Sequence, residues 1–142
     1  MNRAHLTITS NSKNVALARL TVATFASELD YTLGELEEIK VAVSEAVTNS
    51  IIHGYPRTEG DIDIKMIIDE QQLTVIITDY GVGIPDVQAV LEPSFSTKNE
   101  HMGLGFSFID SFMDDFDVES DLNTGTVVTM SKVPERLKKV VE

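Results

Sequence analysis

The sequence predicts an α/β protein of the α+β kind: a two-layer sandwich in which helices cover one face of a mixed, mostly antiparallel sheet. Three observations predict it. Strand-like segments come in adjacent pairs joined by short turns, as in hairpins, and do not alternate one by one with helices. Helix-like segments carry apolar side chains at helical spacing. The chain has 142 residues, enough for one sizeable core, so we expect a single domain over residues 1–142.

The N-terminal part of the chain predicts one strand and two helices. Residues 5–9 alternate polar and apolar side chains, which indicates a short strand. A helix over residues 12–28 follows, and its narrow apolar stripe consists of Val15, Ala18, Val22, Phe25, Ala26 and Leu29. A second helix opens with a capping box of Thr32 and Glu35 and ends near Gly54. The predicted core face of this helix consists of Leu36, Ile39, Val43, Ala46, Val47 and Ser50.

Two hairpins are expected in the rest of the chain. The first pairs residues 62–68 with residues 73–77 around a turn at 69–72, with one face in the core. The second joins residues 116–119 to residues 126–131 through a short turn.

Three further helices are expected: one near residues 86–91, one that opens at 103–105 and a charged tail helix that begins at Pro134. The predicted core face of the middle one is Phe108, Ile109, Phe112 and Met113. Residues 92–102 form a polar stretch with little periodicity. Long polar loops inside compact domains are commonly functional lids.

Composition narrows the function. Eleven Lys and Arg residues stand against 23 Asp and Glu residues, which gives a net charge of −12. Such a charge repels a phosphate backbone, so we expect no direct contact with nucleic acid and favour a basic or amphipathic protein partner. The absence of cysteine excludes thiol catalysis and disulfides. No leader-like segment and no apolar run of about 18 residues occurs, so we expect a cytoplasmic protein that does not enter a membrane.

A polar stripe lies on the second predicted helix. Glu45, Asn49 and His53 follow one another at i+4 steps, and the helical period places them roughly opposite the apolar face. The plainer interpretation is a solvated polar face. The alternative is a carboxylate that takes a proton beside an amide that holds the shell of a divalent cation.

Asp79 is the strongest single candidate for ligand recognition. Because side chains alternate along a strand, it continues the inward row of apolar residues in the segment before it. A buried carboxylate needs donors, which either the amides of the following turn or a ligand can supply. Gly81 and Gly83 favour a ligand because they remove side chains where a planar group could approach the backbone. An adenine amino group is a suitable donor.

A candidate anion site precedes the helix that opens at residues 103–105. Gly103 and Gly105 can leave backbone amides free at the positive end of the helix dipole. Upstream, Thr97 and Lys98 carry a hydroxyl and an ammonium group that can reach phosphates. The chain contains no Gly-x-x-x-x-Gly-Lys loop and no Gly-x-Ser-x-Gly elbow.

In this chain order the motifs resemble the Bergerat ATP-binding fold of gyrase, the ninety-kilodalton heat-shock chaperone, sensor histidine kinases and mismatch-repair ATPases. Residues 45–49, Glu-Ala-Val-Thr-Asn, resemble its N box. Residues 79–83, Asp-Tyr-Gly-Val-Gly, resemble its G1 box, and residues 103–105 its G2 box. Gly125 and Thr126 stand where its last motif should be.

The resemblance narrows to the anti-sigma factor serine-protein kinases, above all those of sporulation. Residues 43–55 and the Phe-Met-Asp-Asp segment 112–115 carry it, and the similarity covers nearly the whole chain. It implies a homodimeric protein that binds and inhibits a sigma factor of RNA polymerase. It also implies that Mg-ATP is used to phosphorylate a serine of an anti-anti-sigma factor. One departure is the short connection 99–102, which contains no arginine.

The resemblance also implies roles for single residues. Glu45 would be the general base, Asn49 the Mg²⁺ ligand, Asp79 the adenine reader and Thr126 a second contact near the base. The other residues expected to bind ATP are Gly81, Gly83, Thr97, Lys98, Gly103 and Gly105.

Two alternatives stay open: an ATP-gated sigma-binding module without phosphotransfer, and a histidine-kinase-type catalytic domain. Glu45 favours a kinase over a binding module, because binding alone needs no carboxylate beside the metal position. The chain has no room for a separate phosphoacceptor hairpin, which disfavours the histidine kinase.

The first predicted helix indicates a protein interface. Its side away from the core stripe holds Ala16, Leu17, Leu20, Ala23 and Thr24. An exposed helix should carry charge there, so we expect a homodimer contact through Leu17 and Leu20. Arg19 flanks the core stripe and is expected to anchor acidic groups of a protein partner; the plainer interpretation is an ordinary surface ion pair.

Overall fold

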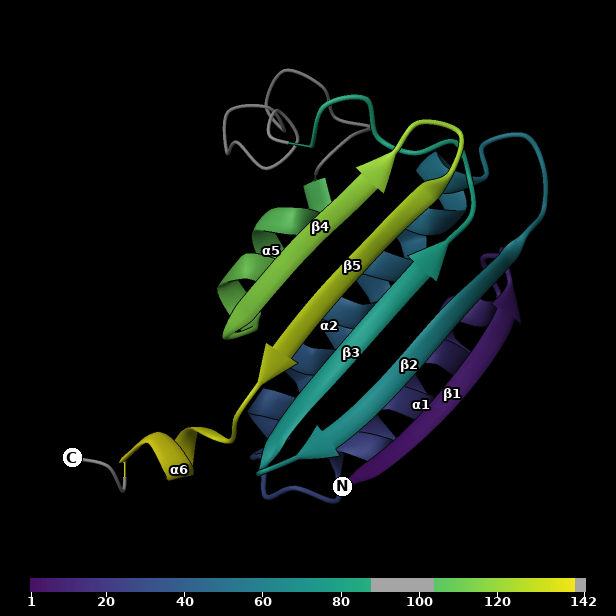
Figure 1. The fold of residues 1–142 in the computed structure, drawn as a ribbon. Coiled ribbons are helices and arrows are strands. Elements are labelled where there is room, and N and C mark those ends of the chain that lie inside the picture. The colour runs from purple at the N-terminus through teal and green to yellow at the C-terminus, as the bar shows by residue number, and fades with distance from the viewer. Residues whose placement is uncertain (88–103, 140–142) are drawn as a thin grey trace.

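Helices cover one face of a five-stranded sheet, and no helix among residues 1–87 and 104–139 covers the other face (Figure 1). The computed structural model describes residues 1–87 and 104–139. Its elements are β1 (Asn2–Thr9), α1 (Asn14–Ala26), α2 (Leu33–Asn49), the π-helical turn η1 (Ser50–Gly54), β2 (Asp61–Asp69), β3 (Gln72–Asp79), α5 (Leu104–Phe112), β4 (Asp115–Asp121), β5 (Gly125–Lys132) and α6 (Glu135–Lys139). The strand order is β1-β2-β3-β5-β4, and neighbouring strands pair antiparallel. The predicted α+β sandwich is confirmed.

Strict alternation along β2 and β3 builds the sheet side of the core. The inward side chains of the two strands are all buried: Ile62, Ile64, Met66, Ile68, Leu73, Val75, Ile77 and Asp79. The connecting residues Glu70 and Gln71 both have positive φ angles, 51° and 65°, as a two-residue hairpin turn that matches the strand twist requires. This turn fixes the register, so Asp79 ends the inward row as the sequence predicts.

The helix α2 is the centre of the covering layer, with α1 and α5 packed against it. Its predicted capping box is present: the Glu35 N–H donates to the Thr32 hydroxyl at 3.1 Å, and the Thr32 N–H donates to the Glu35 carboxylate at 2.9 Å. At its other end the helix widens into η1, where the Tyr55 N–H donates to the Ser50 carbonyl at 3.1 Å. Such wide turns are frequent at functional sites.

The structure corrects the predicted faces of two helices. Ala23 in α1 is buried and does not belong to the exposed side, because α1 packs against both α2 and the sheet. In α5 the buried aromatic residue is Phe106, whereas Phe108 is 50% exposed. Phe106 shares the helix face of Ile109 and also packs on Phe116 of β4, with ring centroids 6.0 Å apart.

The ends of two predicted segments also differ. The first strand begins at Asn2, because β1 pairs with β2 along its whole length, from Asn2 opposite Ile68 to Thr9 opposite Asp61. Most of the helix expected near residues 86–91 and the stretch 92–102 lie outside the described residues. Among the described residues, no helix has the length and apolar character that crossing a bilayer requires.

Candidate functional site

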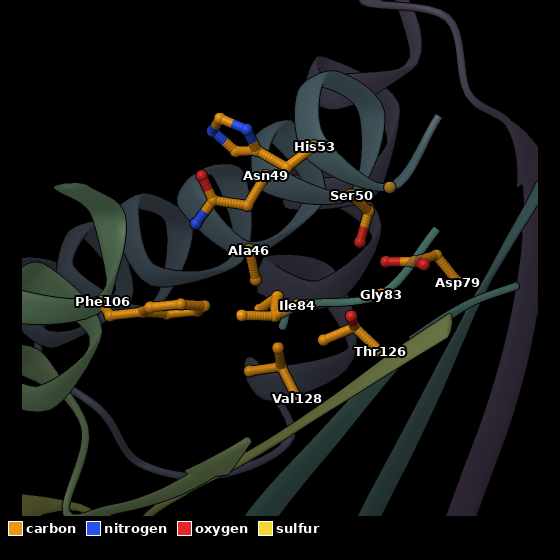
Figure 2. A pocket seen from close by; sticks show the side chains of 11 residues that line it. Ala46, Asn49, Ser50, His53, Asp79, Gly83, Ile84, Phe106, Thr126 and Val128 are labelled. Atoms are coloured by element: carbon orange, nitrogen blue, oxygen red, sulfur yellow. The ribbon is translucent and has the colours of Figure 1, made fainter. Parts of the chain in front are cut away.

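A pocket opens where β3 ends, between the sheet and the C-terminal end of α2 (Figure 2). It is lined by Ala46, Asn49, Ser50, His53, Gly54, Asp79, Gly83, Ile84, Phe106, Thr126 and Val128. Figure 2 shows the oxygen atoms of Ser50, Asp79 and Thr126 converging on one side. The apolar side chains of Ala46, Ile84, Phe106 and Val128 gather on the other side. An apolar slot with a polar end suits a flat heteroaromatic ring.

Asp79 is the polar centre of the pocket, and only 3% of it is exposed. Its carboxylate accepts a hydrogen bond from the Gly81 N–H at 3.0 Å, and also from the Ser50 hydroxyl and the Thr126 backbone N–H. Burial raises the pKa of Asp79 above its ordinary value, and these three donors offset the effect only in part. A carboxylate has room for about four hydrogen bonds, so one acceptor position remains for a ligand.

Three glycines let separate segments meet around Asp79. A Cβ atom on Gly54 would lie 2.9 Å from the Asp79 carboxyl group, and one on Gly81 would lie 1.9 Å from the Gly54 carbonyl oxygen. Gly125, with φ of 129°, would place a Cβ atom 2.0 Å from the Asp79 carbonyl oxygen. Gly81 therefore makes room for the backbone of Gly54 and does not line the pocket, whereas Gly83 does.

Asn49 supplies an amide nitrogen that lacks a hydrogen-bond partner within the described residues. Its Nδ2 atom is buried and has no hydrogen-bond partner within the part of the chain that the structure describes. Burying an amide group without a hydrogen bond is costly, so the arrangement favours a ligand at this point. Because the oxygen and nitrogen of an amide can exchange places by a flip, Asn49 can offer either a donor or a carbonyl oxygen.

The helical period predicted that the polar stripe of α2 lies roughly opposite the apolar face, and the structure contradicts this prediction. Asn49 and His53 line the pocket beside Ala46 and Ser50, because steps of four residues drift toward the buried face and η1 then widens the helix. Glu45 is half-buried one turn before Asn49 and is not among the residues that line the pocket. The stripe is therefore a flank of the pocket and not a fully solvated surface.

Two tyrosines that the sequence did not single out hold the segment after β3. The Tyr55 hydroxyl donates to the Asp61 carbonyl at 2.7 Å and accepts from the Tyr80 N–H at 2.7 Å. On the open face of the sheet, the Tyr80 hydroxyl donates to Asp63. The residue next to Asp79 is therefore fixed through both its backbone and its side chain.

Ser120 of β4 is a third residue that the sequence did not indicate. Its Oγ atom lies 2.7 Å from the Ile84 N atom, 3.0 Å from the Gly125 carbonyl oxygen and 2.8 Å from Thr126 Oγ1. It joins two pocket-lining residues from different segments.

The remaining candidates lie apart from the pocket or outside the described residues. Thr97, Lys98 and Gly103 lie outside them, and Gly105 is in the first turn of α5. On α1, Leu17 is 49% exposed and Leu20 is 53% exposed. Arg19, on the same helix, is half-buried. A shallow groove between α1 and the sheet is lined by Ala4, Leu20, Thr21, Thr24, Phe25 and Met66.

The donor set around the pocket suits a cation that a bound phosphate chain helps to hold. Among the described residues, no group of three or more His, Asp or Glu side chains could hold a metal ion by itself. Mg²⁺ is commonly bound through one or two protein oxygens together with waters and substrate phosphates. Asn49 fits that pattern when its amide is flipped, because its oxygen then takes the buried position of the unpartnered Nδ2 atom.

Comparisons with known proteins agree with this architecture. A family model described as the histidine kinase-like ATPase domain matches residues 8–132. The anti-sigma F factor of Clostridium acetobutylicum is 44% identical over 133 residues, which cover 92% of this chain and 93% of that protein. The anti-sigma F factor of Geobacillus kaustophilus is 46% identical over 134 residues, 92% of each chain. A blue-light activated histidine kinase of Erythrobacter litoralis shares the fold, with a TM-score of 0.61 at 19% identity over 84% of this chain and 41% of that one.

Proposed function

The chain belongs to the histidine kinase-like ATPase domain family and, within it, to the anti-sigma F factors, and from this premise we propose its activity in detail. It binds and inhibits a sigma factor of RNA polymerase, and it uses Mg-ATP to phosphorylate a serine of an anti-anti-sigma factor. Residues 1–142 act as one ATP-binding kinase domain, and a protein with these partners works in the cytoplasm. The buried Asp79 carboxylate, which keeps an acceptor position at the polar end of an apolar slot, carries this proposal.

The adenine ring occupies the slot and Asp79 accepts a hydrogen bond from its amino group. The apolar walls, which include Phe106, Ile84 and Val128, exclude water from the ring. A guanine ring would turn a carbonyl oxygen toward the Asp79 carboxylate and leave both groups without a donor. Thr126 lies on the same side of the pocket and makes the second polar contact near the base.

The phosphoryl group is transferred near Asn49, one helical turn from Glu45. Mg²⁺, when bound, neutralises charge on the phosphates. Asn49 offers its carbonyl oxygen to this ion after a flip of the amide, which brings the oxygen to the buried position of the unpartnered Nδ2 atom. Glu45 accepts the proton of the substrate serine hydroxyl and orients that hydroxyl toward the phosphate chain. Thr97, Lys98, Gly103 and Gly105 complete the phosphate contacts in this proposal.

The proposal includes a protein-binding surface on α1. Leu17 and Leu20 are both about half exposed on a helix whose outer side carries little charge, which supports a homodimer contact there. Arg19, which is half-buried on the same helix, anchors acidic groups of a protein partner. Neither residue on which the dimer depends lines the pocket, so this contact and nucleotide binding can be tested separately.

Substitution of Glu45 distinguishes the proposed kinase from an ATP-gated module without phosphotransfer. With labelled ATP, Mg²⁺ and a candidate anti-anti-sigma protein, the wild-type chain should transfer phosphate to a serine. Glu45→Ala should bind ATP with nearly unchanged affinity and lose about 10²-fold or more of the transfer rate, because a base acts in the chemical step. Glu37→Ala is the matched control, since Glu37 lies on the same helix and is exposed.

A normal transfer rate in Glu45→Ala would place Glu45 on the protein surface without a chemical role. No transfer by the wild-type chain, together with normal ATP binding, would favour the binding module. Phosphate found on a histidine of the partner, and not on a serine, would favour the histidine-kinase-type activity.

A further inference from the structure

The hydrogen bonds of Ser120 leave only one arrangement of its hydroxyl proton. A serine hydroxyl has one hydrogen to donate and two lone pairs that accept. The Gly125 carbonyl, 3.0 Å from Ser120 Oγ, can only accept, so Ser120 donates its hydrogen there. The Ile84 N–H, with its nitrogen 2.7 Å away, can only donate, so it uses one lone pair. The third partner, Thr126 Oγ1 at 2.8 Å, must then donate into the second lone pair.

This arrangement decides what Thr126 can offer to the pocket. Its single hydroxyl hydrogen is used toward Ser120, which lies on the neighbouring strand, opposite it in the register of β4 and β5. The Thr126 oxygen therefore presents only lone pairs to a ligand. Thr126 is 8% exposed and lines the pocket, so bulk water cannot readily supply an alternative partner that reverses the bond.

At the polar end of the pocket, Asp79 and Thr126 therefore each offer an acceptor, and neither offers a free hydroxyl donor. One is the acceptor position that remains on Asp79 after its three internal donors, and the other is Thr126 Oγ1. An exocyclic amino group has two hydrogens and can satisfy both, whereas a carbonyl oxygen in the same place can satisfy neither.

We propose that Ser120 is a specificity-determining positioning residue, which holds the Thr126 hydroxyl as an acceptor so that the pocket selects a 6-aminopurine and rejects a 6-oxopurine. The inference rests on the proposed binding of ATP. Ser120 does not line the pocket and acts only through Thr126. When Ser120 is removed, the Thr126 hydroxyl regains its hydrogen and can turn it toward a carbonyl oxygen.

A purely structural role of Ser120 predicts a different result. Ser120 also holds the Ile84 N–H, so its loss could loosen the segment that carries Gly83 and Ile84. Such loosening would weaken all purine nucleotides alike, because Ile84 contacts the ring through an apolar side chain. Selection between ATP and inosine triphosphate, which differ at the six-position of the ring and its adjoining nitrogen, separates the two roles.

The test compares the dissociation constants of ATP and inosine triphosphate by calorimetry, with Mg²⁺ present. Ser120→Ala should reduce the preference for ATP about tenfold, the factor that one hydrogen bond of ordinary net strength corresponds to. Ser120→Thr keeps the hydroxyl and should restore the wild-type preference. Thr126→Val should reduce the preference by itself, and adding Ser120→Ala to it should change the preference no further.

Each outcome bears on a separate claim. An unchanged preference in folded Ser120→Ala would overturn the inference, and so would an effect of Ser120→Ala that is equally large with and without the Thr126→Val substitution. If Ser120→Ala does not fold, Ser120→Cys replaces it, since it keeps the shape of the side chain and forms only weak hydrogen bonds. A wild-type chain that binds neither nucleotide would instead contradict the proposed function.

Discussion

At the scale of single residues, Asp79 combines burial with charge, and this combination has a thermodynamic signature. Its pKa lies above the ordinary value of 3.8 because burial disfavours the ionised form, whereas in the unfolded chain it titrates normally. The stability that the ligand-free fold draws from this residue is therefore greatest below the unfolded pKa. It falls as the pH rises through the folded pKa, because the folded state holds the proton more tightly.

The prediction is that Asp79→Asn removes this loss of stability. Between about pH 4 and pH 7, the free energy of unfolding of the variant should rise relative to that of ligand-free wild type. Urea unfolding at a series of pH values, without nucleotide, measures the difference. Asp69→Asn is the control, since Asp69 is exposed at the hairpin turn. A difference that stays constant over this range would show that Asp79 titrates normally in the fold.

Substitution by alanine should have different effects at two glycines, a gain of stability at Gly34 and a loss of ATP affinity at Gly54. At Gly34 in α2 the nearest atom to a new Cβ would be Thr32 Oγ1 at 3.8 Å, so Gly34→Ala should stabilise the protein by about 0.5–1 kcal/mol. At Gly54 the new Cβ would lie 2.9 Å from the Asp79 carboxyl group, so Gly54→Ala should weaken ATP binding about tenfold or more. Thermal unfolding and calorimetry report the two effects. Equal behaviour of the two variants would contradict the close approach at Gly54.

Sequence reasoning reached some of these residues and not others for a physical reason. The inward orientation of Asp79 follows from the strand period of two, which the adjacent residues already show. Ser120 and Tyr55 act through partners from other segments, such as Ile84 and Tyr80, which only the folded chain brings near. No local pattern encodes such contacts.

At the scale of elements, Glu35 connects two helices that are far apart in the chain. One carboxylate oxygen completes the capping box of α2, and the other accepts the Glu135 N–H of α6 at 2.8 Å. Burial alone would raise the pKa of Glu35, but hydrogen bonds from the backbone of Thr32 and Glu135 lower it below the ordinary value of 4.5. Its contribution to stability is therefore present above that value and is lost as the pH falls through the folded pKa.

Glu35→Ala should lower the free energy of unfolding by about 1–3 kcal/mol at neutral pH, because it removes half of the capping box and the partner of the partly buried Glu135 N–H. The deficit should shrink as the pH falls below the ordinary carboxyl pKa. Glu37→Ala, which removes an exposed ion pair with Lys40, should cost less than about 1 kcal/mol. Chemical unfolding at neutral and acid pH checks both variants; equal losses would mean that Glu35 is only a surface charge.

The sequence predicted the elements that have strong local signals. It did not predict which side of α5 faces the core, and it did not predict the π-helical turn η1. The capping box of α2 and the hairpin turn at Glu70 and Gln71 are local, so both could be predicted. The helix α5 contains three phenylalanines within seven residues, and periodicity alone does not say which of them faces inward. The structure places Phe106 inward because Phe116 of β4 packs on it. The π-helical turn η1 has no reliable sequence signal.

At the scale of the whole molecule, α1 lies behind the β1 edge of the sheet, and the turn between β4 and β5 lies at the opposite edge (Figure 1). Leu20→Glu should convert the proposed homodimer into a folded monomer, because a charge at the centre of an apolar contact is not compensated. Sedimentation at micromolar concentration measures the change. Leu122→Glu is the matched control, since Leu122 is 58% exposed against 53% for Leu20 but lies in the β4–β5 turn. A wild-type chain that sediments as a monomer would overturn the interface on α1.

The two-layer arrangement could be predicted because hairpins leave few topologies open. The order of the strands could not, since β5 inserts between β3 and β4 through contacts between residues far apart in the chain, such as Ile77 opposite Val128. The same insertion brings Thr126 beside Asp79. The candidate site is therefore partly a product of long-range strand pairing.

The two ends of α2 differ in how completely their polar groups are satisfied. At its start, Thr32 and Glu35 are fully engaged, and the nearby Tyr31 hydroxyl donates to the Lys132 carbonyl at 2.6 Å. At its far end, the buried Nδ2 atom of Asn49 has no hydrogen-bond partner among the described residues, and the regular helix gives way to η1. Local opening of the helix should therefore begin at the pocket end, and backbone amides there should exchange with deuterium first. A nucleotide that engages Asn49 would slow exchange at that end and leave the first turns of α2 unchanged, so ligand binding would even out the rigidity of one helix.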